Sequence, residues 1–169
     1  MFEAMHEIFS YAGETQGSGV FLAARLLENV RGEAARDGLP FAGSVTPGEA
    51  WELFNSGEAV LVDVRTAEER QFVGCVPDTL HVPWMTGISL LRNPRFVKEL
   101  QAKVSDKQDV VLLLCRSGKR SAAAAEAAAK AGFSNVFNVL EGFEGDLDDA
   151  GHRGSFNGWR HAGLPWKQG

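Results

Sequence analysis

The sequence has little cysteine and no long apolar run. Its 169 residues contain only Cys75 and Cys115, which are too few for a disulfide scaffold and lack the Cys-x-x-Cys spacing of zinc sites. No apolar run approaches the roughly 20 residues of a membrane helix. Residues 1–10 contain two glutamates and a histidine, and they lack the basic start and apolar run of a signal peptide. We therefore expect a cytoplasmic protein with no membrane partner.

The sequence also lacks an excess of positive charge. Its net charge of −5 argues against nucleic acid or an anionic membrane as the main partner. With 44% hydrophobic and 23% charged residues, the composition is that of an ordinary globular domain. The four histidines and the acidic run in residues 144–149 show no metal-ligand spacing. We expect neither a metal site nor a cofactor.

Residues 1–40 are predicted to form a helical extension. Residues 1–12 predict a short helix or arm, and the glycines in residues 13–19 predict a flexible joint after it. Across residues 20–36 an apolar residue recurs every three or four positions, which predicts an amphipathic helix. Its apolar face is formed by Phe21, Ala24, Leu27, Val30 and Ala34. This face packs on its own domain or on a second subunit of a homodimer, and residues 41–169 form the main domain.

Strands and helices alternate along residues 41–169. Strands are predicted at four short apolar runs: 59–64, 80–82, 110–114 and 135–140. The run at 110–114 is the most apolar and is the predicted central strand. Helices are predicted to follow Thr46-Pro47, Thr66 and Asn93-Pro94, and to cover residues 121–131. This alternation predicts an α/β fold of three layers around a parallel sheet.

The loop that begins at Cys115 carries the candidate chemistry. Ligands of an open α/β sheet bind at the carboxyl ends of its strands, where this loop lies. A loop that enters a helix there can aim several backbone N–H groups at one point, and the helix dipole adds positive potential. Three cations lie in the loop: Arg116, Lys119 and Arg120. Gly118 permits a tight turn. Together these features favour the thiolate of Cys115 and attract an anion beside it.

The order of motifs resembles that of the single-domain rhodanese family. Cys-Arg-Ser-Gly-x-Arg-Ser at residues 115–121 is similar to the family's active-site loop, and Asp63-Val64-Arg65 is similar to its Asp-x-Arg strand end. Further similar segments are 68–72, 80–84, 141–143 and 158–166. The resemblance covers residues 43–166. It implies the rhodanese-like three-layer fold, with a central, mostly parallel five-stranded sheet and helices on both faces.

The resemblance implies a sulfurtransferase that uses no cofactor. The thiolate of Cys115 would attack the outer sulfur of a thiosulfate-like donor, release sulfite and keep the sulfur as a persulfide. A thiol or cyanide acceptor, or a protein partner, would then remove it. The loop would hold the persulfide through its backbone amides and the donor anion through its cations. The substrate-binding residues implied are Arg116, Ser117, Gly118, Lys119, Arg120 and Ser121. Asp63 and Arg65 would support the loop and the sheet.

Several alternatives stay open beside this interpretation. A persulfide relay between proteins would use the same Cys115. A noncatalytic interaction domain conflicts with a cysteine retained in a complete cationic loop. Phosphatases and arsenate reductases of the same fold use Cys-x5-Arg, whereas Arg120 gives a shorter Cys-x4-Arg loop that suits a sulfur atom. Cys75 stands where the family usually has histidine. It is either a small, partly buried side chain or a second thiol that exchanges sulfur or a disulfide with Cys115.

Overall fold

The N-terminal helix is longer and more continuous than the sequence suggests. The computed structural model describes residues 11–169, so most of the arm expected at residues 1–12 lies outside the described part. Helix α1 runs unbroken from Tyr11 to Asp37, and the predicted flexible joint at residues 13–19 is wrong. Each glycine weakens a helix by about 1 kcal/mol, but helix formation is cooperative, and the good helix formers that follow extend the helix through them.

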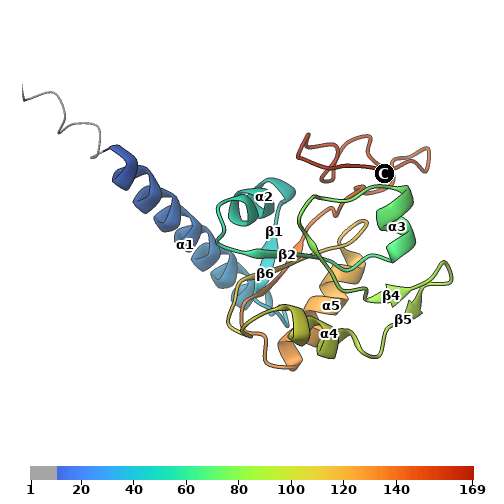
Figure 1. The fold of residues 1–169 in the computed structure, drawn as a ribbon, viewed down its shortest axis with the longest axis horizontal. Helices are drawn as coiled ribbons and strands as arrows, with labels where there is room; N and C mark the ends of the chain where they lie inside the picture. The colour runs from blue at the N-terminus through green and yellow to red at the C-terminus, as the bar shows by residue number, and fades with distance from the viewer. Residues whose placement is uncertain (1–10) are drawn as a thin grey trace, which may run out of the picture.

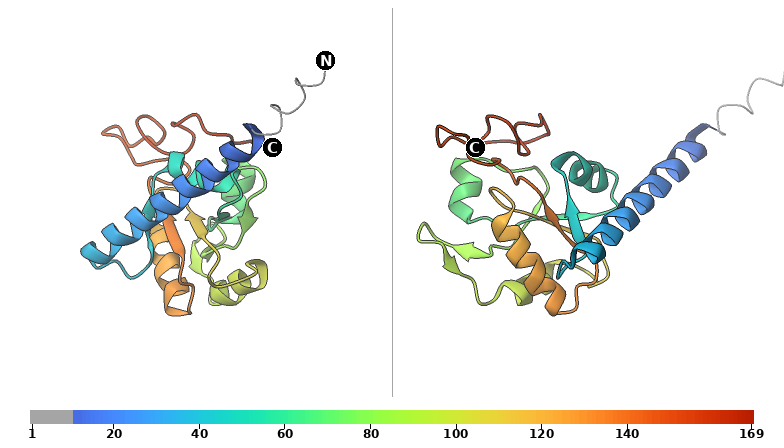
Figure 2. Two further views of the ribbon diagram at one scale, coloured as in Figure 1. Left: turned by 90° about the vertical axis from the view of Figure 1, so that its left-hand side faces the viewer. Right: turned by 180° about the vertical axis from the view of Figure 1, so that it is seen from behind.

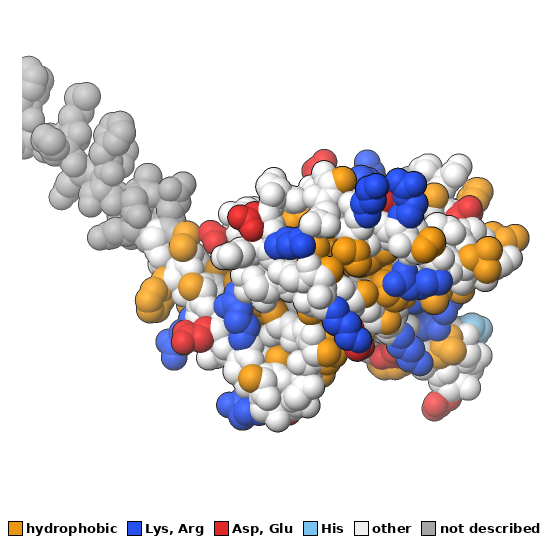
Figure 3. All heavy atoms as spheres, turned by 90° about the horizontal axis from the view of Figure 1, so that it is seen from below, with side chains coloured by type: hydrophobic (Ala, Val, Ile, Leu, Met, Phe, Trp, Pro, Cys, Tyr) orange, Lys and Arg blue, Asp and Glu red, His pale blue; other side chains and the backbone are white. Residues whose placement is uncertain are grey.

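Only the second half of α1 packs on the domain (Figures 1 and 2). Its buried side chains are Leu27, Val30 and Ala34. Arg31 fixes this half further, because its Nη2 donates to Asn135 Oδ1 at 2.8 Å and its guanidinium lies 5.5 Å from the Phe137 ring centroid. The first half projects, and apolar side chains are exposed at this end (Figure 3): Val20, Phe21 and Leu22. Packing on its own domain is confirmed for the second half, while a homodimer through the helix stays a prediction.

The central sheet has five strands, and every pairing in it is parallel. The strands are β1 (Gly43–Val45), β2 (Val60–Asp63), β3 (Leu80–His81), β6 (Val111–Leu114) and β7 (Val136–Val139). Their order is β1-β7-β6-β2-β3, so β6 is the middle strand, as predicted, and all its side chains are buried. Parallel sheets of this kind need apolar cover on both faces, which explains the continuous apolar runs.

Helices cover both faces of the sheet, which confirms the three-layer α/β fold (Figures 1 and 2). Besides α1 they are α2 (Pro47–Asn55), α3 (Ala67–Phe72), α4 (Phe96–Lys103) and α5 (Lys119–Lys130). One apolar cluster joins the sheet to α4 and α5 through Phe96, Leu100, Ala124 and Ala128. The other joins it to α1 and α2 through Leu27, Val30, Ala50 and Leu53. Thr46 and Thr66 each form a complete capping box, so both predicted helix starts are confirmed.

Three short strands carry almost no sequence signal: β1, β4 (Met85–Thr86) and β5 (Leu91–Arg92). Strand β1 has three residues, and it forms because it pairs with β7 and receives α1 on its other side; a side chain at Gly43 would collide with Val30. A short antiparallel hairpin joins β4 to β5 outside the main sheet. Elements this short have no hydrophobic period to detect. None of the helices between residues 11 and 169 has the length and apolarity of a membrane span.

Candidate active site

Cys115 lies at the carboxyl end of the middle strand, at the start of the loop that leads into α5. It directly follows β6 and is 1% exposed. Its Sγ accepts hydrogen bonds from the backbone N–H of Gly118 and from the Ser121 hydroxyl, both at 3.1 Å. Gly118 is the N-cap of α5 and has a φ of 93°, a left-handed conformation that glycine adopts without strain. Two hydrogen-bond donors and the N-terminus of α5 therefore meet at one sulfur atom.

Ser121 and Asn138 form a buried polar pair next to this sulfur, and the sequence predicted only Ser121 as a site residue. Ser121 is fully buried in the first turn of α5, and its Oγ lies 2.5 Å from Asn138 Oδ1 on β7. Asn138 is 5% exposed and was missed by sequence reasoning. A signal was present, because Asn138 is the one polar residue in a strand of otherwise apolar, buried side chains. Burying a carboxamide costs free energy unless it is hydrogen-bonded, and the bond to Ser121 offsets this cost for Asn138.

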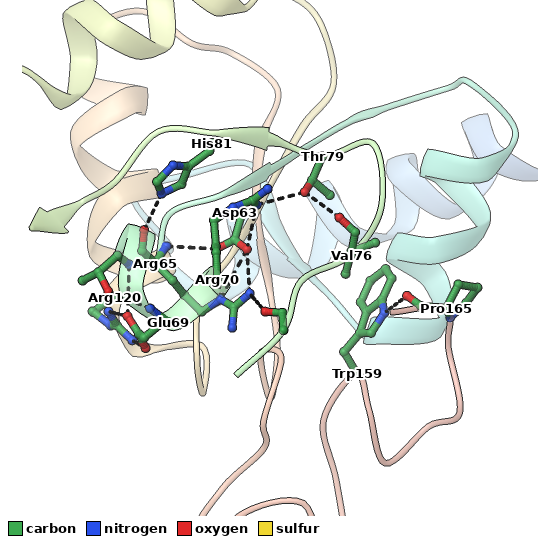
Figure 4. A network of polar contacts seen from close by, with 12 residues as sticks. Asp63, Arg65, Glu69, Arg70, Val76, Thr79, His81, Arg120, Trp159 and Pro165 are labelled. Atoms are coloured by element: carbon green, nitrogen blue, oxygen red, sulfur yellow. Dashed lines mark hydrogen bonds and ion pairs between the residues drawn. The ribbon is translucent and has the colours of Figure 1, made fainter. Parts of the chain in front are cut away.

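The three loop cations are not equivalent. Arg116 and Lys119 form no ion pair with the residues that the structure describes, and the buried Nε of Arg116 has no hydrogen-bond partner there. Arg120 instead makes a bidentate ion pair with Glu69 of α3, at 2.8 and 2.6 Å (Figure 4). Both amino groups of the Arg120 guanidinium are therefore taken up by Glu69. The role of Arg120 as a substrate ligand stays a prediction.

The Glu69–Arg120 pair ties α3 to α5. Burial raises the pKa of the Glu69 carboxyl, but the hydrogen bond from Arg120 and that from the backbone N–H of Thr66 outweigh it, so the pKa falls to about 2. The hydrogen bond to Glu69 in turn raises the pKa of Arg120. Both side chains are less than a fifth exposed. The pair is therefore charged on both sides throughout the neutral range.

A second ion-pair network fills the end of the neighbouring strand (Figure 4). Asp63, the last residue of β2, accepts from Arg65 Nη2 at 2.7 Å and from Arg70 Nη1 at 3.0 Å. Asp63 and Arg65 are fully buried. Arg65 also donates to the carbonyl oxygen of Gly74 at 2.8 Å, and its guanidinium lies 4.1 Å from the Phe143 ring centroid. Asp63 and Arg65 thus bind each other and the segment around Gly74, and their role as supports of the loop stays a prediction.

The segment after β7 packs directly on the loop that begins at Cys115. The backbone N–H of Phe143 donates to the carbonyl oxygen of Cys115 at 2.8 Å, and that of Glu144 donates to Arg116 at 3.0 Å. Gly142 has a φ of 67°, and a Cβ there would lie 2.5 Å from the Arg116 oxygen and the Ser117 nitrogen. Only glycine fits this contact. The sequence predicted a family segment at residues 141–143 without revealing this packing.

Cys75 lies in the chain after α3. It is partly buried, and its backbone exchanges hydrogen bonds of 2.8 and 2.9 Å with Lys167. Both cysteines are free thiols. Sulfur or disulfide exchange with Cys115 stays a prediction. In the described part of the chain, no three His, Cys, Asp or Glu side chains are grouped as metal ligands would be.

Comparisons with known proteins identify the family of the chain. The family model described as Rhodanese-like domain matches residues 46–148. An uncharacterized protein of Rickettsia rickettsii, a homolog of RP600, is 36% identical over 116 residues, which are 68% of this chain and 88% of that protein. The thiosulfate sulfurtransferase GlpE of Actinobacillus succinogenes is 31% identical over 121 residues, 72% of this chain and 86% of that protein. The crystal structure of Rv0390 from M. tuberculosis is 46% identical, with a TM-score of 0.69, and the match covers 76% of this chain and 99% of that chain.

Proposed function

The chain belongs to the rhodanese-like domain family, as the order of its motifs predicted, and we propose that it is a sulfurtransferase whose intermediate is a persulfide on Cys115. The observation that carries the proposal is the environment of the Cys115 sulfur. It accepts hydrogen bonds from Gly118 and Ser121 at the N-terminus of α5. Such donors stabilise a negatively charged sulfur and therefore suit both a thiolate and a persulfide.

The proposed reaction has two displacement steps on sulfur. In the first, the Cys115 thiolate attacks the outer sulfur of thiosulfate or of a persulfide donor. The S–S bond of thiosulfate breaks, and sulfite leaves with the bonding electron pair. In the second, an acceptor such as cyanide or a thiolate attacks the outer sulfur of the persulfide, and Cys115 leaves as a thiolate. The intermediate is anionic throughout, so hydrogen-bond donors serve both steps and no proton transfer is required.

The unpaired cations supply the attraction for an anionic donor. Arg116 and Lys119 have no ion-pair partner in the part of the chain that the structure describes, and they flank the backbone that turns around Cys115. Two unbalanced positive charges near the helix N-terminus favour a thiosulfate dianion over a neutral substrate. The backbone amides and side chains of residues 116–121 form the proposed donor site, and Asp63 with Arg65 supports it from behind.

The pairing of Arg120 favours sulfur transfer over phosphatase or arsenate reductase chemistry. Those enzymes use the arginine of Cys-x5-Arg to hold a tetrahedral oxyanion. Here the spacing is one residue shorter, and both Arg120 amino groups bind Glu69. A relay between protein partners remains the alternative, since it would use the same sulfur.

A steady-state assay with thiosulfate and cyanide tests the proposal. Thiocyanate formation is measured for the wild type, for Cys115→Ser and for the matched control Cys75→Ser. We expect Cys115→Ser to keep its fold by circular dichroism and to lose at least about 1,000-fold in rate, because a hydroxyl is a far weaker nucleophile at neutral pH. Activity that persists in Cys115→Ser would contradict the persulfide mechanism. A loss in Cys75→Ser as well would assign the second thiol a part in transfer.

A further inference from the structure

Asn138 and Ser121 form a buried polar pair directly behind the reactive sulfur. The Ser121 oxygen lies 3.1 Å from Cys115 Sγ and 2.5 Å from Asn138 Oδ1. Ser121 is 0% exposed and Asn138 is 5% exposed. The Ser121 hydroxyl is the only side chain among the described residues that hydrogen-bonds to either the Cys115 sulfur or the Asn138 carboxamide.

The sheet explains why Asn138 can act on this site. In the parallel pairing of β6 and β7, Asn138 is the partner of Leu113, and Leu113 and Cys115 lie on the same face of the sheet because side chains alternate along a strand. Ser121 rests on that face from the first turn of α5. Three side chains therefore meet at one point: Cys115 directly after β6, Ser121 of α5 and Asn138 of β7.

One hydroxyl proton cannot serve two acceptors. A serine hydroxyl carries a single proton, yet both Cys115 Sγ and Asn138 Oδ1 lie within hydrogen-bond distance of it. When the proton is given to Asn138, the sulfur receives nothing from Ser121, which suits a neutral thiol. A half-turn of the carboxamide places its NH2 group where its oxygen was, and the amide then donates to Ser121 Oγ. The hydroxyl proton is thereby directed at the sulfur, which suits a thiolate or a persulfide.

We propose that Asn138 is a positioning residue for the sulfur chemistry: its carboxamide orients the Ser121 hydroxyl so that it donates to Cys115 whenever the sulfur is anionic. Without the carboxamide, the sulfur is the one described side-chain partner left to the hydroxyl, and no second partner fixes the rotation of the hydroxyl. The proposal rests on the proposed function only in taking Cys115 as the reactive sulfur. Asn138 itself touches neither donor nor acceptor.

The test is the rate of Cys115 alkylation by iodoacetamide, in a Cys75→Ser background so that a single thiol reacts. At about pH 7, we expect Ser121→Ala to react at least about tenfold more slowly than the parent, since a hydrogen bond to a charged group is lost. We expect Asn138→Leu to react about fivefold more slowly, since an ordinary hydrogen bond is lost. The differences between the variants should shrink towards about pH 10, because the hydrogen bonds assist the formation of the anion.

Two further comparisons separate positioning from packing. In the Ser121→Ala background, Asn138→Leu should have no further effect on the rate at about pH 7, because Asn138 acts through the hydroxyl. Asn138→Val, whose β-branched side chain suits a strand, repeats the measurement if the leucine variant unfolds. Equal slowing with and without Ser121, slowing that is undiminished at about pH 10, or no slowing at all would overturn the proposal. Alkylation needs no sulfur donor, so these outcomes do not depend on whether the protein transfers sulfur.

Discussion

Two segments at the same edge of the sheet handle charge in opposite ways. In the loop after β6, which begins at Cys115, Arg116 and Lys119 have no ion-pair partner among the residues that the structure describes. The segment after β2 instead pairs its own charges, Asp63 with Arg65 and Arg70. The first arrangement leaves positive potential for a ligand, whereas the second holds Asp63, Arg65 and Arg70 in ion pairs within the protein. Similar residue types thus serve binding in one segment and support in the other, and the difference lies in their partners.

Arg120 connects the two segments. It lies in the loop after β6, yet its guanidinium is bound by Glu69, which follows β2. The Glu69–Arg120 ion pair and the contact of Phe143 with Arg65 connect the loop after β6 to the ion-pair network of Asp63. The contrast between the two segments predicts that changes in the network lower stability first, whereas changes in the loop lower activity first.

Asp63→Asn should have the largest effect, and the effect should be on stability. It leaves the buried Arg65 and the partly buried Arg70 without their carboxylate, so we expect a loss of about 3–5 kcal/mol in the free energy of unfolding. Urea denaturation measures this value. The matched control is Asp78→Asn, an exposed position with a φ of 62° that asparagine tolerates well. Equal midpoints for the two variants would contradict the supporting role of the network.

Gly142→Ala should act on the loop and hence on activity. The added methyl group collides with the backbone of Arg116 and Ser117, so the loop must move, and we expect turnover to fall about 100-fold. Gly57→Ala is the control, because Gly57 also has a positive φ but has open space around it. Both variants carry the backbone strain, so only the first should lose thiocyanate formation per folded molecule. A similar turnover in both variants would show that the close contact of Gly142 with the loop is not needed for activity.

The loop cations should affect the Michaelis constant. We expect Lys119→Ala to raise the constant for thiosulfate about fivefold at unchanged stability, as about 1 kcal/mol of attraction in a hydrated site implies. Arg120→Ala should destabilise the protein, because Glu69 loses its partner, and a raised constant in this variant would assign Arg120 a part in donor binding as well. Lys98→Ala, at an exposed position on α4, is the control. An unchanged constant in Arg120→Ala would assign Arg120 to the supporting network alone.

Glu69→Gln should have the smallest effect, a loss of stability at neutral pH that disappears in acid. The pKa of Glu69 is lowered to about 2 in the folded protein, from an ordinary value of 4.5. The carboxylate therefore stabilises the fold fully above about pH 4.5, and this contribution is lost as the pH falls towards about 2. We expect the wild type to lose on the order of 1 kcal/mol more than the Gln variant across this window, since the pair is partly open to solvent. Glu52→Gln, at an exposed position on α2, is the control, and its stability should depend on pH as that of the wild type does.

The sequence predicted well where the determining residues are close together. The strand β6 follows from one apolar run, and the capping boxes at Thr46 and Thr66 follow from residues three positions apart. The candidate loop was recognised for the same reason, because Cys115 and its cations are contiguous. The error at residues 13–19 has a different origin, since helix continuity depends on cooperativity along the whole of α1 and not on single glycines.

The features that were missed depend on contacts between distant segments. Glu69 and Arg120 are 51 positions apart, and Ser121 and Asn138 are 17 apart. Gly142 is needed because of the backbone of Arg116, which no local pattern reveals. These contacts arise only once the parallel sheet has brought the ends of its strands to one edge.

The central claim is that Cys115 carries sulfur, and the most direct test is a mass measurement. The reduced protein is incubated with thiosulfate, its intact mass is recorded, and peptides are mapped without a reducing agent. The account predicts a gain of one sulfur atom, located on the peptide that contains Cys115. No gain, or a gain on Cys75 with none on Cys115, would contradict it.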